Sequence, residues 1–135
     1  MAIPTSIVFV CLHGAAKSVI AATHCQRLIE EHGRTVRVTA CGVEPDATIP
    51  APVIAGLRGD GFDVGPRPPA PLDAASLDGA ELIVSIGCDV ANVADVAASG
   101  AAVVRWDDVP QVSDGYDAAR DIIVAHVERL LNDLR

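Results

Sequence analysis

The sequence predicts an α/β domain in which helices cover both faces of a parallel β-sheet. Four apolar runs rich in β-branched residues have the length of buried strands. Segments with helical spacing separate these runs, and the connections between them are short. A chain of 135 residues has the length of one domain, so we expect residues 1–135 to form a single unit.

The first half of the chain supplies two strands and a long helix. The apolar run SIVFVCL predicts a strand over residues 6–12, and RVTACGV predicts a second one over residues 37–43. Between them, a helix from residue 17 ends at Gly33, a residue that commonly follows a helix end. Its apolar face is formed by Ile20, Ala21, Cys25, Leu28 and Ile29.

The middle of the chain is expected to hold a short helix, a loop and a third strand. Residues 48–62 have helical spacing with prolines near the start, a position that proline tolerates in helices. Residues 65–72, GPRPPAPL, have the composition of a loop. The run AELIVSIG predicts another buried strand over residues 80–87.

The last third contributes one more strand and a C-terminal helix. Residues 89–100 are predicted to be helical or turn-like, and AAVVRWD predicts the fourth strand over residues 101–107. From Asp114 onward the pattern is that of a strongly amphipathic helix. Its apolar stripe consists of Ala119, Ile123, Val127, Leu130 and Leu134.

Composition excludes several classes of protein. The net charge of −8 argues against general binding to nucleic acid or to acidic membranes. The chain has no apolar stretch near the roughly 18 residues of a membrane span, and its start lacks the features of a signal peptide. We therefore expect a cytoplasmic protein whose cysteines are reduced at rest. Their spacing indicates no metal site, and nothing in the sequence predicts the oligomeric state.

The stretch VCLHGAAKS predicts a site for an oxyanion. Cys11 ends the first strand, and Lys17 and Ser18 begin the following helix, so the backbone N–H groups in between lack helical partners. Successive N–H groups of this kind form an anion-binding nest, and the positive helix end favours the thiolate of Cys11. Ser18 could hydrogen-bond that sulfur. The residues expected to surround the anion are Leu12, His13, Gly14, Ala15, Ala16, Lys17 and Ser18.

This stretch resembles the low-molecular-weight protein tyrosine phosphatases and the arsenate reductases that share their fold. Their signature is an apolar strand, then C-x5-R-S/T, then a helix, and IVFVCLHGAAKSVIAA matches it in length and register. The detail CLHGA is most similar to actinobacterial arsenate reductases. AELIVSIGCD and RWDDVP resemble the strand with a second cysteine and the acid loop, so the likeness covers nearly the whole chain.

The resemblance implies a flavodoxin-like, three-layer sandwich whose four parallel strands take the order 2-1-3-4. It implies that Cys11 attacks arsenic or phosphorus with support from the loop, Lys17 and Ser18. Cys88 would then attack the adduct and release arsenite as a disulfide forms. It implies no cofactor beyond an external thiol reductant of the mycothiol or thioredoxin type, and it places the general acid near Asp107 or Asp108.

The chain departs from the family pattern at several positions. Lys17 replaces an arginine that would hold two oxyanion oxygens with a planar fork. Gly14 stands where many members have asparagine, and glycine reaches the left-handed conformation unaided. Alignment on the tryptophan and proline of RWDDVP puts Gln111 at the acid position, and Asp95 replaces a third relay cysteine. We therefore expect weak or absent turnover.

Several functions remain open at this point. The leading hypothesis is an arsenate reductase-like or phosphatase-like protein that binds arsenate, phosphate or sulfate at the Cys11–Ser18 loop, in the setting of arsenic resistance. The alternatives are a non-catalytic oxyanion sensor or interaction module, in effect a pseudo-enzyme, and a protein tyrosine phosphatase. For Cys88, a redox role and a structural role are equally consistent with the sequence.

Overall fold

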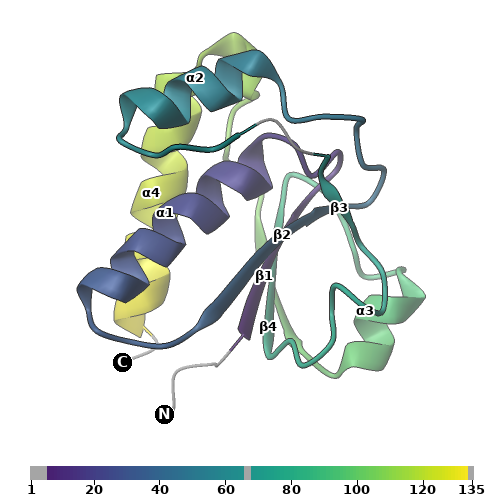
Figure 1. The fold of residues 1–135 in the computed structure, drawn as a ribbon. Helices are drawn as coiled ribbons and strands as arrows, with labels where there is room; N and C mark the ends of the chain where they lie inside the picture. Colours follow the sequence, from purple (N-terminus) through teal and green to yellow (C-terminus); the bar gives the residue numbers. More distant parts are fainter. Residues whose placement is uncertain (1–5, 66–67, 134–135) are drawn as a thin grey trace.

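The fold is a parallel five-stranded sheet between two layers of helices and turns (Figure 1). The computed structural model describes residues 6–65 and 68–133. The sheet order is β3-β2-β1-β4-β5, and every neighbouring pair is parallel. Its strands are β1 (Ser6–Cys11), β2 (Arg37–Gly42), β3 (Ala70–Pro71), β4 (Leu82–Ile86) and β5 (Ala102–Trp106).

The four expected strands are present in the expected order, and the sheet gains one short edge strand. β3 lies within residues 65–72, which the sequence analysis assigned to a loop. Ala70 and Pro71 pair with Cys41 and Gly42 at the end of β2. A strand of two residues within a proline-rich segment is too short to show an alternating pattern in the sequence. Proline is tolerated in β3 because this strand lies at the edge of the sheet.

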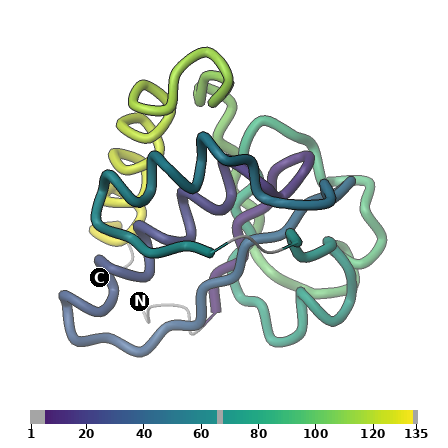
Figure 2. The backbone as a smooth tube through the Cα atoms, turned by 45° about the horizontal axis from the view of Figure 1, so that its top comes forward, coloured from purple at the N-terminus to yellow at the C-terminus, as the bar shows by residue number. Residues whose placement is uncertain are grey.

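The helices divide into two layers. Helices α1 (Lys17–Glu31), α2 (Ala51–Gly59) and α4 (Tyr116–Asp133) lie on one face of the sheet, and α3 (Ala94–Ser99) lies on the other (Figure 1). The turned view of Figure 2 shows the same separation. Alternation along β1 supplies both cores, because Ile7 and Phe9 face α1 and α4 while Val8 and Val10 face α3.

The two long helices follow their apolar stripes. Ala119, Ile123 and Val127 of α4 are fully buried, as is Cys25 of α1, while Leu28 is only partly buried. Leu134 of the predicted stripe lies outside the described residues. Helix α1 ends just before Gly33, whose φ of +67° is the left-handed conformation expected beyond a helix end.

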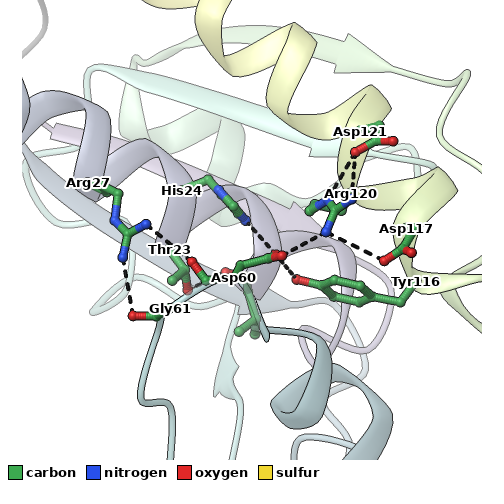
Figure 3. Close-up of polar contacts among 10 residues, drawn as sticks. Thr23, His24, Arg27, Asp60, Gly61, Tyr116, Asp117, Arg120 and Asp121 are labelled. Carbon is green, nitrogen blue, oxygen red and sulfur yellow. Dashed lines mark hydrogen bonds and ion pairs between the residues drawn. The ribbon is translucent and has the colours of Figure 1, made fainter. Parts of the chain in front are cut away.

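A polar cluster around Asp60 joins the three helices of the first layer (Figure 3). Asp60 follows α2 and accepts hydrogen bonds from Tyr116 (2.7 Å) and Arg120 (2.7 Å) of α4, and His24 Nε2 of α1 lies 3.2 Å from it. Burial raises the pKa of Asp60, but the bonds from Tyr116 and Arg120 outweigh burial and lower it. Burial lowers the pKa of His24. The cluster thus holds a partly buried carboxylate that joins the end of α2 to α1 and α4.

Within residues 6–65 and 68–133, no helix combines the length and apolar character needed to cross a bilayer.

Candidate anion-binding and thiol site

Three of the four cysteines meet at the carboxyl ends of the strands, as the sequence predicts. Cys11 ends β1, Cys41 is the next-to-last residue of β2, and Cys88 comes two residues after β4. All four cysteines are free thiols. Ligands of open parallel sheets bind at this edge, and the order β2-β1-β4 places the crossover point at β1.

The thiol of Cys11 lies beneath the start of α1. Its Sγ atom is 3.2 Å from Oγ of Ser18, within hydrogen-bond distance, and both side chains are buried. This contact is the one the sequence predicts for Ser18. A hydroxyl whose partner is a buried sulfur can donate its proton when that sulfur is a thiolate, so it supports the nucleophilic form.

The first carbonyl groups of the loop after Cys11 point toward the segment that follows β2. The carbonyls of Cys11, Leu12 and His13 accept hydrogen bonds from the amides of Val43 (3.3 Å), Glu44 (2.7 Å) and residue 46 (3.1 Å). In a trans peptide the N–H points opposite to the C=O, so the N–H groups of residues 12–14 point away from the 43–46 segment. We therefore expect these N–H groups to be available to an anion.

The loop approaches the end of β2 so closely that two glycines are required. A β-carbon on Gly14 would lie 2.5 Å from the backbone nitrogen of Gly42, and one on Gly42 would lie 2.4 Å from the backbone nitrogen of Gly14. Gly14 also has a φ of +63°. An asparagine side chain at this position would therefore not fit unless the end of β2 moved. Sequence analysis identified Gly14 but missed Gly42, whose only signal was a glycine ending a predicted strand.

The remaining loop residues have different surroundings. The ring of His13 points at the β2–α2 connection, where Nδ1 lies 3.1 Å from the carbonyl oxygen of Glu44 and 3.5 Å from Asp46. Leu12 is 43% exposed, although it is a large apolar side chain. Ala15 is buried and Ala16 is half-buried, so neither adds bulk above the thiol.

Lys17 reaches across to the turn that follows β4. A β-carbon on Gly87 would lie 2.9 Å from Nζ of Lys17, so the ammonium group rests against this residue. Gly87 has a φ of +69° and precedes Cys88. The ammonium of Lys17 therefore lies beside the turn that carries Cys88.

Cys88 is half-buried and belongs to the opposite face of the sheet from Cys11. Cys11 packs in the cluster beneath α1 and α4, whereas Cys88 packs against the cluster that contains Cys41 and faces α3. Its Sγ lies 3.9 Å from the carbonyl oxygen of Val10, the residue before Cys11. Burial raises the pKa of Cys88, the neighbouring Cys11 raises it further, and Arg105 and Lys17 lower it.

The other two cysteines are suited to the core. Burial raises the pKa of Cys25 and of Cys41 to about 12 in each case, and both side chains are fully buried. They stay protonated at neutral pH and are poor nucleophiles. Among residues 6–65 and 68–133, no group of three His, Cys, Asp or Glu side chains is placed to hold a metal ion.

Both candidate acids are engaged in ion pairs. Asp107 Oδ1 accepts a 2.7 Å hydrogen bond from Nε of Arg105, and Asp108 lies 2.7 Å from Nε2 of His126. The ring of His126 stacks on Trp106, which ties the start of the acid loop to α4. These contacts direct Asp107 toward β5 and Asp108 toward α4. The role of either as a general acid remains a prediction.

Comparison with known proteins identifies the architecture. No protein-family model matches the chain, and no curated protein matches its sequence significantly. An arsenate reductase in the phosphate-binding state is 19% identical, with a TM-score of 0.78 over 97% of this chain and 99% of that one. A mutant of YwlE from Bacillus subtilis is 18% identical, with a TM-score of 0.83 over 96% and 98%. A low-molecular-weight protein tyrosine phosphatase from Bacillus subtilis is 18% identical, with a TM-score of 0.78 over 96% of each chain.

The chain has the low-molecular-weight phosphatase fold. At these identities the likeness concerns the fold, and the chemistry of the site must be argued from its own residues. In this phosphatase fold the segment between β1 and α1 lies at the ligand-binding edge of the sheet. Cys11 and Ser18 lie at the two ends of that segment.

Proposed function

We propose that this protein binds arsenate or phosphate in the Cys11–Ser18 loop and performs thiol chemistry of the arsenate reductase type. The observation that supports this most strongly is the buried pair of Cys11 and Ser18 under a loop whose carbonyls turn outward. A tetrahedral oxyanion would accept hydrogen bonds from the loop amides and from Lys17. The thiol would then lie beneath its central atom.

The proposed reaction has two steps. The Cys11 thiolate attacks arsenic, a sulfur–arsenic bond forms, and hydroxide leaves as water after taking a proton. The Cys88 thiolate then attacks Sγ of Cys11, the sulfur–arsenic bond breaks, and its electron pair stays on arsenic. Arsenic(V) is thereby reduced to arsenite while two thiols become one disulfide, which an external thiol of the mycothiol or thioredoxin type reduces again.

The first test is anion binding measured by thermal unfolding. Arsenate or phosphate at about ten times its Kd should raise the stability by about 1.4 kcal/mol, whereas chloride at equal ionic strength should not. The Lys17→Gln and Ser18→Ala variants should show a smaller rise. Arg34→Gln is the matched control, because Arg34 lies beyond the other end of α1. An unchanged melting temperature in millimolar arsenate and phosphate would exclude the proposal.

The second test concerns the disulfide. Cys11 and Cys88 pack against opposite faces of the sheet, so we expect the turn after β4 to move before their sulfur atoms can bond. The bond requires Cα atoms within about 7 Å of each other. After arsenate turnover or mild peroxide, peptide mapping should find the Cys11–Cys88 pair and leave Cys25 unmodified. If Cys88 remains a free thiol under both conditions, an external thiol would have to complete the reaction alone.

A phosphatase acting on a larger substrate is the second candidate. A groove of about 660 Å³ between α1, β2, Phe62 and residues 68–70 has Gly14 in its lining, and it carries polar side chains of α1 such as Thr23 and Gln26. Such a groove favours a ligand larger than a bare oxyanion. Hydrolysis of an aryl phosphate without thiol oxidation would favour this candidate. Anion binding without either activity would favour an oxyanion sensor.

A further inference from the structure

Two cations from different elements lie beside the turn after β4. Nζ of Lys17 at the start of α1 rests against Gly87. Nη1 of Arg105 on β5 lies 3.6 Å from a carboxylate oxygen of Asp89. Cys88 is the residue between these two contacts. Its side chain is half-buried, so its sulfur is partly shielded from bulk water.

Charge at this position affects the reactivity of the thiol. A cation near a partly buried sulfur favours the thiolate, since the low local dielectric strengthens the attraction. Burial is the largest influence on Cys88 and raises its pKa, and Cys11 of β1 raises it further. The backbone of Ile86, Arg105 and Lys17 act in the opposite direction and favour the thiolate. The charge of Arg105 is partly offset by its ion pairs with Asp89 and Asp107. Among residues 6–65 and 68–133, no acidic side chain forms an ion pair with Lys17, so its ammonium can serve an incoming or developing anion.

We propose that Lys17 and Arg105 together stabilise the thiolate of Cys88, so that the lysine in the arginine position serves the resolving thiol as well as the oxyanion. This inference rests on the proposed function, in which Cys88 is the thiol that attacks Cys11 in the second step. In the second step Cys88 must lose its proton before its sulfur attacks Cys11, and that loss creates negative charge beside Gly87. An arginine whose fork held two oxyanion oxygens would have less freedom to reach this turn.

The inference also gives each cation a distinct role. Lys17 begins α1 directly after the loop, and its Nζ lies against Gly87 in the turn. Its charge can therefore stabilise the oxyanion first and the thiolate of Cys88 as arsenite departs. Arg105 is fixed by Asp107 at 2.7 Å and acts as a constant charge on the far side of the turn. Loss of Lys17 should therefore affect both anion binding and Cys88, whereas loss of Arg105 should affect Cys88 alone.

The test measures the alkylation rate of Cys88 by iodoacetamide as a function of pH. The Cys11→Ser background removes the other reactive thiol, while Cys25 and Cys41 are fully buried. A Cys11→Ser/Cys88→Ser variant gives the background rate. We expect Lys17→Gln and Arg105→Gln to move the midpoint of the profile to higher pH. The rate at pH 7 should fall by about threefold, because a smaller fraction of the thiol is ionised. The fall is no larger because the thiolate of a less acidic thiol is intrinsically more nucleophilic.

Matched variants separate charge from structure. Without an oxyanion in the solution, Lys17→Arg should keep the midpoint near its original pH, and Arg34→Gln should leave it unchanged. Unchanged midpoints in both Lys17→Gln and Arg105→Gln would overturn the inference. A midpoint that moves equally in Arg34→Gln would also overturn it, because the effect would then be general.

Phosphate-dependent thermal unfolding of the parent protein distinguishes this inference from the proposed function. If phosphate does not stabilise the protein but the Cys88 profile moves as expected, the proposed function fails while the charge effect on Cys88 stands. If phosphate stabilises it and the profile does not move, the inference fails alone. A loss of phosphate stabilisation in Lys17→Gln but not in Arg105→Gln would support the distinct roles of the two cations.

Discussion

Replacing Gly14 by alanine should destabilise the protein by about 3 kcal/mol or more and abolish anion binding. Two costs combine at this position. A φ of +63° costs an L residue about 1–2 kcal/mol, and the new β-carbon would collide with the backbone of Gly42, for which overpacking adds about 1–3 kcal/mol. Either the loop or the end of β2 must move, and both carry groups of the proposed site. Urea unfolding and the arsenate-dependent thermal shift measure the two effects.

The chain contains its own controls for this experiment. Gly33 has nearly the same φ, +67°, but nothing lies within 4 Å of a β-carbon there, so Gly33→Ala isolates the backbone cost of about 1–2 kcal/mol. Gly59 is at the end of α2 with open space and no positive φ, so alanine should be neutral or stabilising by up to about 1 kcal/mol. Gly42→Ala isolates the collision. Anion binding that survives Gly14→Ala, with a stability loss no greater than in Gly33→Ala, would show that the close approach is not needed.

The sequence was sufficient to predict the two central strands of the sheet because both have an apolar pattern on two faces. β1 and β4 are buried on both faces, so SIVFVC and LIVSI have no polar alternation that could mislead the assignment. β3 was missed because its two residues, Ala70 and Pro71, have no strand propensity and are held only by pairing with the end of β2. Edge pairing of this kind depends on tertiary contacts.

The site was predictable where it is local and not where it depends on distant segments. Cys11 and Ser18 are seven residues apart, and a strand–loop–helix pattern was sufficient to expect their contact. The approach of Gly42 to Gly14 and the reach of Lys17 to Gly87 join different elements, and no spacing along the chain encodes them. The partners of Asp107 and Asp108 were likewise unpredictable, since they depend on how β5 and α4 are placed.

The double variant Lys17→Arg/Gln111→Asp should gain at least about 10²-fold in aryl-phosphate hydrolysis or arsenate reduction over the parent chain. The parent has a buried thiol with a hydroxyl partner, so we expect its deficit to lie in neutralising charge and in protonating the leaving group. Arginine restores a bidentate donor to the oxyanion. Aspartate at Gln111 adds an acid on an exposed position of the loop, where Asp107 and Asp108 are held in ion pairs.

The controls for the double variant separate chemistry from binding. Adding Cys11→Ser to the double variant must abolish the gain. Replacing Gln111 by asparagine instead of aspartate must give none of the increase that a proton donor provides. The two substitutions should be non-additive, because both act on one transition state. A double variant that binds phosphate as tightly as the parent yet remains inert would mean that positioning, not charge, is at fault. The close packing of Gly14 on Gly42 would then fix the loop in a geometry that binds the anion without aligning it for attack, and an oxyanion sensor would become the better description of the protein.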